Sequence, residues 1–176
     1  MSSFTRKTRR KDVDYSVNIG NSAKASVRHA DTKQIIRDHA TVSVAYDQLM
    51  TLFDVTVHRC FGWGKKTRAR LHAKMARHLL CLKSRMVTTQ DIEQIVTDES
   101  GFDLKKCHIK VEGWEHDRKL RLSATDDMSA IFMIALMDEF GYKKVRLARA
   151  YSTAADIAHE ITTGQLSWDA VKKELA

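Results

Sequence analysis

Apolar residues recur at helical spacing over most of the chain. Asp31 is a suitable N-cap, and the apolar side chains after it fall mostly at spacings of three, four or seven, as on one side of a long helix. These side chains are Ile35, Val42, Tyr46, Leu49, Leu52, Phe53 and Val57. The pattern predicts a helix that ends near Cys60, where the turn Phe61-Gly62-Trp63-Gly64 begins.

The second half of the chain repeats this pattern. Residues 49–97 align without gaps on residues 128–176, and the turn FGWGK falls on FGYKK. Thr88 and Ser167, which can both cap a following helix, also fall on each other. Each copy predicts an apolar helix, a turn, a long helix and a short helix. Two unrelated amphipathic hairpins are the alternative, but the shared turn and the ungapped register favour a duplication.

Between the two copies, apolar and charged residues alternate with a period of two. Apolar and charged residues alternate on either side of Gly113, which favours a β-hairpin. They are Ile109, Lys110, Val111 and Glu112 before the turn and Lys119, Leu120, Arg121 and Leu122 after it. The expected fold class is mostly α, with two tandem helical-hairpin units and a small β-hairpin between them. The expected boundaries are a disordered basic tail at 1–30, a first helical unit at 31–99, the connecting β-hairpin at 100–125 and a second helical unit at 126–176.

Composition narrows the class of protein. The chain of 176 residues is 43% hydrophobic and contains no proline and only seven glycines, which excludes global disorder and turn-rich sandwiches. Three cysteines do not make a disulfide scaffold, and no apolar run suggests a signal peptide or a membrane span. We expect a soluble cytoplasmic protein.

Charge is divided unequally along the chain. Residues 1–88 hold 18 Lys and Arg against six Asp, a net charge of +12, whereas residues 89–176 have a net charge of −4. A basic half favours an anionic partner, with nucleic acid ahead of an acidic protein or a membrane surface. Opposite charges also permit a homodimer.

The first helix after the FGWGK turn carries the strongest candidate site. Residues 59–85 hold nine Lys and Arg and no acid, and Lys66, Arg70 and Lys74 begin a row at spacings of four that Arg77 completes. The candidate nucleic-acid-binding residues are Lys65, Lys66, Arg68, Arg70, Lys74, Arg77 and Arg85. The tail adds Arg6, Lys7, Arg9, Arg10 and Lys11. An acidic protein partner or a merely solvated face remains open for the row, and a solubilising arm remains open for the tail.

The turn itself has two interpretations. Gly62-Trp63-Gly64 before a basic helix is compatible with a helix-turn-helix, but the helices are longer than in that motif, so an αα-hairpin is the simpler account. Trp63 and Tyr142 are more typical of core plugs at a hairpin corner than of base-stacking platforms.

Metal and catalytic signals are weak. Zinc-type ligands occur at His58, Cys60, Cys81, Cys107 and His108, but no paired spacing organises them. His116-Asp117, in a predicted turn, matches the dipeptide of HD phosphohydrolases without further ligands. No nucleophile elbow or phosphate-binding glycine loop occurs. We expect no bound metal, no cofactor and no enzyme activity.

Two runs in the first copy, LFDVTVHRCFGWGKKTRARL and MVTTQDIEQIVTDESGFDL, carry a resemblance. They resemble small helical proteins of Gram-positive phages and prophages that share an FGFGKKRL-type motif. The second copy is similar in FMIALMDEFGYKKVRLAR and QLSWDAVKKEL, but Trp63 and Tyr142 replace the motif's aromatic residue and Lys143 replaces its second glycine. Because that family has no assigned function, the resemblance implies a helical fold and a phage protein in a bacterial host cell, and it transfers no catalytic residue.

The expected function is therefore a non-enzymatic phage-type accessory protein. Its first unit would bind nucleic-acid backbone, and its second unit and hairpin would make structural or protein contacts. The alternative is an inhibitor or modulator that covers an acidic groove of a host polymerase or defence nuclease.

Overall fold

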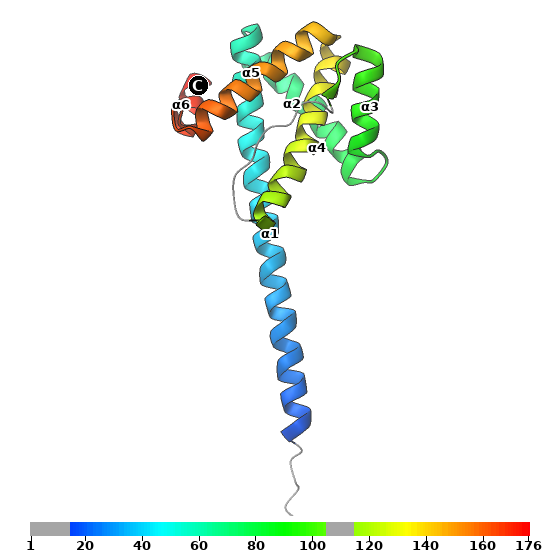
Figure 1. Ribbon diagram of the computed structural model, residues 1–176, viewed down its shortest axis with the longest axis vertical. Coiled ribbons are helices and arrows are strands. Elements are labelled where there is room, and N and C mark those ends of the chain that lie inside the picture. The colour runs from blue at the N-terminus through cyan, green and yellow to red at the C-terminus, as the bar shows by residue number, and fades with distance from the viewer. Residues whose placement is uncertain (1–14, 105–114) are drawn as a thin grey trace, which may run out of the picture. The chain divides into compact units, whose positions relative to one another are not determined.

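The computed structural model describes the backbone of residues 15–104 and 115–176, with side chains from residue 32 onward apart from 105–115. The chain divides into two compact units, Met1–Asp38 and His39–Ala176, and we call the second unit the body. Helix α1, Tyr15–Phe61, contributes residues to both units. The other described helices belong to the body (Figure 1): α2 (Lys65–Lys83), α3 (Thr89–Ser100), α4 (Glu115–Phe140), α5 (Lys144–Thr162) and α6 (Trp168–Glu174).

The mostly helical expectation is confirmed, and the expected β-hairpin is wrong. No described residue lies in a strand, and Leu120 and Leu122 are part of α4. Leu120 begins a series of apolar residues at spacings of four, four and three, and neither glycine nor proline interrupts residues 115–140. The series is Leu120, Ala124, Met128 and Ile131. This longer helical period outweighs a short alternation. Ile109 and Val111 lie outside the described residues.

The start of the first helix also differs from the expectation. Because α1 begins at Tyr15, the second half of the expected tail is helical, and Asp31 lies inside the helix and not at its N-cap. Gly20 is the only glycine in α1 and proline is absent, so the sequence contains no strong helix breaker there. The five expected tail contacts, Arg6 to Lys11, lie outside the described residues.

The two copies have matching helices, as the alignment predicted. Helices α2 and α5 are both 19 residues long and begin 79 residues apart, at Lys65 and Lys144. The glycines that precede them, Gly62 and Gly141, both adopt a positive φ, of 66° and 64°. At the last helix of each copy, Thr88 and Ser167 both accept a hydrogen bond from a backbone N–H three residues on. The duplication therefore extends to turns and caps.

Each copy packs against the other. Helices α2 and α3 of the first copy pack on α4 of the second, where Thr89 donates a hydrogen bond to Asp127. Reciprocally, Cys60 at the end of α1 contacts Thr153 in α5, with 3.0 Å between Sγ and Oγ1. The copies are thus intertwined within the body.

Two stacked rings at the centre of the core show how the two copies are related in space. Phe53 and Phe132 occupy equivalent positions, and their rings stack on each other with centroids 4.2 Å apart and planes 6° apart. Contact between equivalent residues, together with exchanged contacts elsewhere, is the mark of a two-fold relation. The sequence duplication is therefore folded as an internal pseudo-dimer.

Candidate nucleic-acid interface

The FGWGK and FGYKK turns meet at one end of the body, uppermost in Figure 1. We call residues 61–64 and 140–143 the two corners. The Trp63 ring lies 4.2 Å from that of Phe140, and the equivalent exchanged pair, Phe61 and Tyr142, is 5.0 Å apart. The rings pack on one another, which supports the interpretation of Trp63 and Tyr142 as core plugs. Burial raises the pKa of Tyr142, so its hydroxyl stays protonated.

A helix begins immediately after each corner, and every charged side chain in its first turn is positive. Neither α2 nor α5 has an acidic residue in its first turn or a side-chain N-cap hydrogen bond. The first turns instead present Lys65 and Lys66 in α2, and Lys144 and Arg146 in α5, all four exposed. We call these four residues the corner surface. Cations beside the positive end of a helix dipole are unfavourable, by about 0.3–1 kcal/mol each at exposed sites.

Ring contacts position several cations around the corners. The guanidinium carbon of Arg146 lies 5.0 Å from the ring centroid of Tyr142. A second, exchanged pair of contacts places Arg149 6.0 Å from the Phe61 ring and Arg70 5.4 Å from the Phe140 ring. Lys143 is directed elsewhere, because its Nζ donates to the backbone oxygen of Glu99. The corner surface therefore combines exposed lysines at the start of both helices with an arginine held over a ring on α5.

Arg68, in the second turn of α2, is a buried cation. It is 8% exposed, and its Nη2 donates to the backbone oxygen of Leu175 at 3.1 Å. Its Nε has no hydrogen-bond partner, and no carboxylate of the described residues lies within ion-pair distance. A buried charge without a counterion is unfavourable, so Arg68 adds an uncompensated positive charge close to the start of α2.

The expected basic row does not remain a free positive face. Arg70 forms an ion pair of 2.7 Å with Glu139, and Lys74 forms one of 2.9 Å with Asp138, both on the second copy. Only Lys66 and Arg77 of the row are exposed without an ion pair among the described residues. Half of the charge of this row is therefore neutralised by α4.

Two expected contact residues lie apart from the corner surface. Lys65 and Lys83 begin and end the 19 residues of α2, which correspond to about 27 Å of helix. Arg85 follows this far end and has a positive φ of 55°. Arg77 is exposed two turns before that end. The structure thus spreads the predicted residues along the whole helix and does not gather them at one site.

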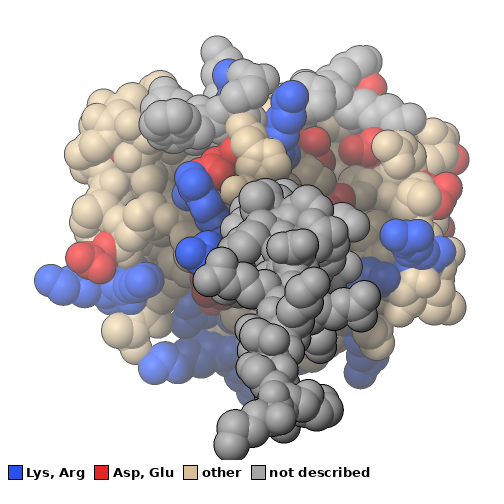
Figure 2. Space-filling view, turned by 90° about the horizontal axis from the view of Figure 1, so that it is seen from below, with Lys and Arg blue, Asp and Glu red and all other residues tan. Residues whose placement is uncertain are grey.

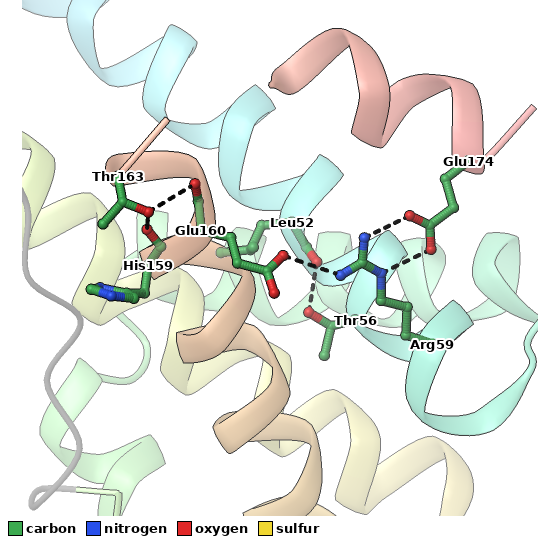
Figure 3. Close-up of polar contacts among 7 residues, drawn as sticks. All are labelled: Leu52, Thr56, Arg59, His159, Glu160, Thr163 and Glu174. Carbon is green, nitrogen blue, oxygen red and sulfur yellow. Dashed lines mark hydrogen bonds and ion pairs between the residues drawn. The ribbon is translucent and has the colours of Figure 1, made fainter. Parts of the chain in front are cut away.

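A second group of ion pairs fixes α1 against the second copy (Figure 3). The Arg59 guanidinium donates two hydrogen bonds to the Glu174 carboxylate, of 2.9 and 2.7 Å, and lies 3.5 Å from Glu160. The hydrogen bonds from Arg59 lower the pKa of Glu174, so this carboxylate is ionised at neutral pH. Arg59 is accordingly a structural cation that links the copies and is absent from the corner surface.

The described residues give no chemistry for a metal site or a membrane span. Within residues 32–104 and 116–176, no three His, Cys, Asp or Glu side chains are placed to hold a metal ion. His116 and Asp117 lie in the first turn of α4, not in the turn that the sequence suggested. Cys107 and His108 lie outside the described ranges. No helix of the described part of the chain is both long and apolar enough to cross a membrane.

The corner surface contains two residues that the sequence analysis missed, Lys144 and Arg146. The alignment held a signal for one of them, since Lys144 falls on Lys65. The signal for a joint surface was absent, because only the folded chain shows that the two corners share one ring cluster. Comparison with family models, curated proteins and solved structures gave no match to this chain.

Proposed function

We propose that the body binds the phosphate backbone of nucleic acid through the corner surface. The observation that carries this proposal is the placement of two helix N-termini at one end of the body, both with first turns whose charged residues are all basic. Backbone N–H groups at a helix N-terminus can donate hydrogen bonds to an anion. The lysine and arginine side chains beside them add positive charge at the surface, where an anion approaches. A phosphate backbone supplies anions at a spacing that several such groups can contact together.

Energetics support a binding role over a structural one. Lys65, Lys66, Lys144 and Arg146 form no ion pair with the described residues, and each stands where a negative charge would stabilise the helix. Arg68 adds its buried charge. The fold would therefore gain from neutral residues at the three lysines, whereas Arg146 is partly compensated by its contact with the Tyr142 ring. A bound polyanion removes the unfavourable interactions at the helix N-termini.

The other end of the body lacks this concentration of one sign of charge. Seen from the end at which α4 begins, Lys and Arg residues are interspersed with Asp and Glu residues (Figure 2). By contrast, residues 59–85, from the first corner through α2, and residues 140–155, from the second corner through the first 12 residues of α5, contain no acidic residue, although Asp156 and Glu160 follow later in α5. A polyanion is thus attracted to the corner end.

The proposed binding reads no base sequence. Lysine and arginine contacts to phosphate position a protein on nucleic acid without identifying bases. Trp63 and Tyr142 pack in the ring cluster and are not presented as stacking platforms. We therefore expect similar affinity for unrelated sequences of equal length.

The decisive experiment is a salt titration with the full chain and a labelled DNA duplex. Four phosphate contacts correspond to a slope of about −3.6 in the logarithm of affinity against the logarithm of salt, or roughly a 100-fold loss between 50 and 200 mM. We expect the variant K65A/K66A/K144A/R146A to lose this contribution and to melt at the same temperature as the wild type or higher. Contributions from other cations, including the tail, cancel in the difference.

The control is R118A/K119A, which removes two cations at the beginning of α4. This helix is 26 residues long, so the pair lies more than 30 Å along it from the corner. The control should retain the wild-type slope. A fourfold corner variant that binds DNA with wild-type affinity and slope would refute the proposal and would leave an acidic protein surface as the partner to test.

A further inference from the structure

Resting on the proposed function, we infer that the polyanion is a duplex and that the two corners contact opposite strands across one groove. The inference depends on the symmetry of the body, which the proposed function does not use. It specifies both the class of nucleic acid and the way in which the chain sits on it.

The two-fold relation is seen at the binding end itself. Trp63 and Tyr142 are equivalent residues whose rings lie 5.9 Å apart, so the pseudo-two-fold axis passes between the corners. The contact of Trp63 with Phe140 is repeated, with the copies exchanged, by the contact of Phe61 with Tyr142. A tandem arrangement related by translation would give neither the contact between equivalent rings nor this exchange.

Exposed cations stand on both sides of this axis. Each corner surface half holds two exposed cations, Lys65 and Lys66 on one side and Lys144 and Arg146 on the other. One cation in each half, Lys65 or Lys144, is the same residue at the equivalent position. The other cation of each half, Lys66 or Arg146, is offset by one position between the copies, because Lys66 aligns with Val145 and Arg146 aligns with Thr67. Each half therefore places at least two exposed cations on its own side of the axis, and Lys143 and Arg149 are further exposed cations on the second side.

A nucleic-acid duplex offers the matching arrangement. Its two backbones are related by local two-fold axes that pass through the grooves, and two-fold proteins align their own axis with one of these. A single strand has no such axis. When the axes coincide, each half of the corner surface faces the phosphates of one strand.

The dimensions are compatible with this placement. Lys65 and Lys144 each follow a ring of the cluster by two residues, which is at most about 7.6 Å of chain. The grooves of B-form DNA are about 12 Å and 6 Å wide. Flexible lysine side chains on either side of a compact ring cluster can therefore reach the two edges of one groove.

The test uses the full chain and a duplex in which one strand has an uncharged methylphosphonate backbone. If the corners contact opposite strands, the salt slope assigned to the corner surface should fall by about half, from roughly 3.6 to 1.8. On an ordinary duplex, K65A/K66A and K144A/R146A should each lose about 1.8, and the fourfold variant should lose the sum. R118A/K119A serves as the matched control on both duplexes.

The outcomes separate this inference from the proposed function. A slope from the corner surface that is unchanged on the half-neutral duplex would place both corners on one strand and overturn the inference, while the proposed function would stand. A tighter, equally corner-dependent complex with a single strand of the same length would also overturn it. Loss of corner dependence on every nucleic acid would instead refute the proposed function.

Discussion

The two copies have the same sequence of helices but opposite charges where they meet. Arg59 at the end of α1 binds Glu160 and Glu174 of the second copy. The residue equivalent to Arg59 is Asp138, which binds Lys74 and lies 3.3 Å from His78 of the first copy. The basic and acidic halves of the sequence are thus complementary within one chain.

Ion pairs between the copies account for the difference between the basic row expected from the sequence and the corner surface found in the structure. Net charges of +12 and −4 suggested a basic face for a partner, yet the structure uses several of those cations to join the copies. The exposed cations of the corner surface, which form no ion pair with the described residues, come from both copies: Lys65 and Lys66 from the first, and Lys144 and Arg146 from the second. Charge that is conspicuous in a sequence is therefore informative about binding only after internal ion pairs have been subtracted.

The largest expected effect is the loss of stability when either ring of the central stack between the copies is removed. Phe53 is 2% exposed and Phe132 is fully buried, so F53A and F132A should each lower the free energy of unfolding by about 3–5 kcal/mol. Because each ring contacts the other, the double variant should lose less than the sum of the two. Urea unfolding of the four proteins, monitored by circular dichroism, measures both effects.

F53L and F132L are the matched controls, since they keep most of the apolar volume and should be less destabilising. Copies that folded independently would give additive losses and two separate unfolding transitions. Either result would contradict the intertwined core.

A smaller effect is expected at a position of positive φ where one copy has an arginine and the other has a glycine. Arg85 adopts a φ of 55°, and the equivalent residue of the second copy is Gly164, with a φ of 75°. A side chain in this left-handed region costs about 1–2 kcal/mol, whereas glycine accepts it readily. R85G should therefore stabilise the protein by about 1 kcal/mol, and G164R should destabilise it by a similar amount, as measured by urea unfolding.

R85A separates the backbone effect from the charge. It keeps a Cβ in the left-handed region, so it should be no more stable than the wild type, and stability of R85A equal to that of R85G would exclude the backbone explanation. R85A also tests the predicted phosphate contact of Arg85. Since Arg85 lies at the opposite end of α2 from the corner surface, we expect its salt slope on duplex DNA to be unchanged.

Sequence periodicity predicted the repeated helices because each apolar stripe and each cap is a local property. Phe61 and Phe140 end equivalent helices, and Thr88 and Ser167 cap equivalent ones, as the ungapped alignment required. The β-hairpin prediction is wrong because the alternation around Leu120 and Leu122 covers only a few residues within a longer helix. Local alternation does not determine structure when a longer helical series passes through the same residues.

The candidate site was only partly predictable, because its composition depends on contacts between distant segments. Lys65 and Lys66 were identified from the acid-free run, but the loss of Arg70 and Lys74 to ion pairs required knowing that α2 packs on α4. Arg146 could not be found from the alignment, since its equivalent is Thr67. The phage resemblance and the nucleic-acid partner remain predictions.

The smallest expected effect concerns His78, which lies where the copies meet and is aligned with the buried residue Ile157. Burial is the main cause of a lowered pKa for His78, and the nearby charge of Lys74 acts in the same direction while Asp138 opposes it. Its Nε2 is buried and 3.3 Å from Asp138 without forming a hydrogen bond. The folded protein thus favours neutral His78.

The sign of the pH dependence follows from this lowered pKa. Between the lowered folded value and the ordinary value of 6.5, the unfolded chain binds more protons, so the contribution of His78 to stability is fully present above pH 6.5 and is lost as pH falls below it. H78I, which copies the second unit, should therefore show a smaller drop in melting temperature between pH 7 and pH 5 than the wild type. H159Q, which changes an exposed histidine of α5, is the matched surface variant for this measurement. If H78I and the wild type lose the same stability over this interval, then His78 does not titrate as its burial between the copies requires. Glu174 does not offer a substitute explanation, because a carboxylate with a lowered pKa loses its contribution only below its ordinary value of 4.5.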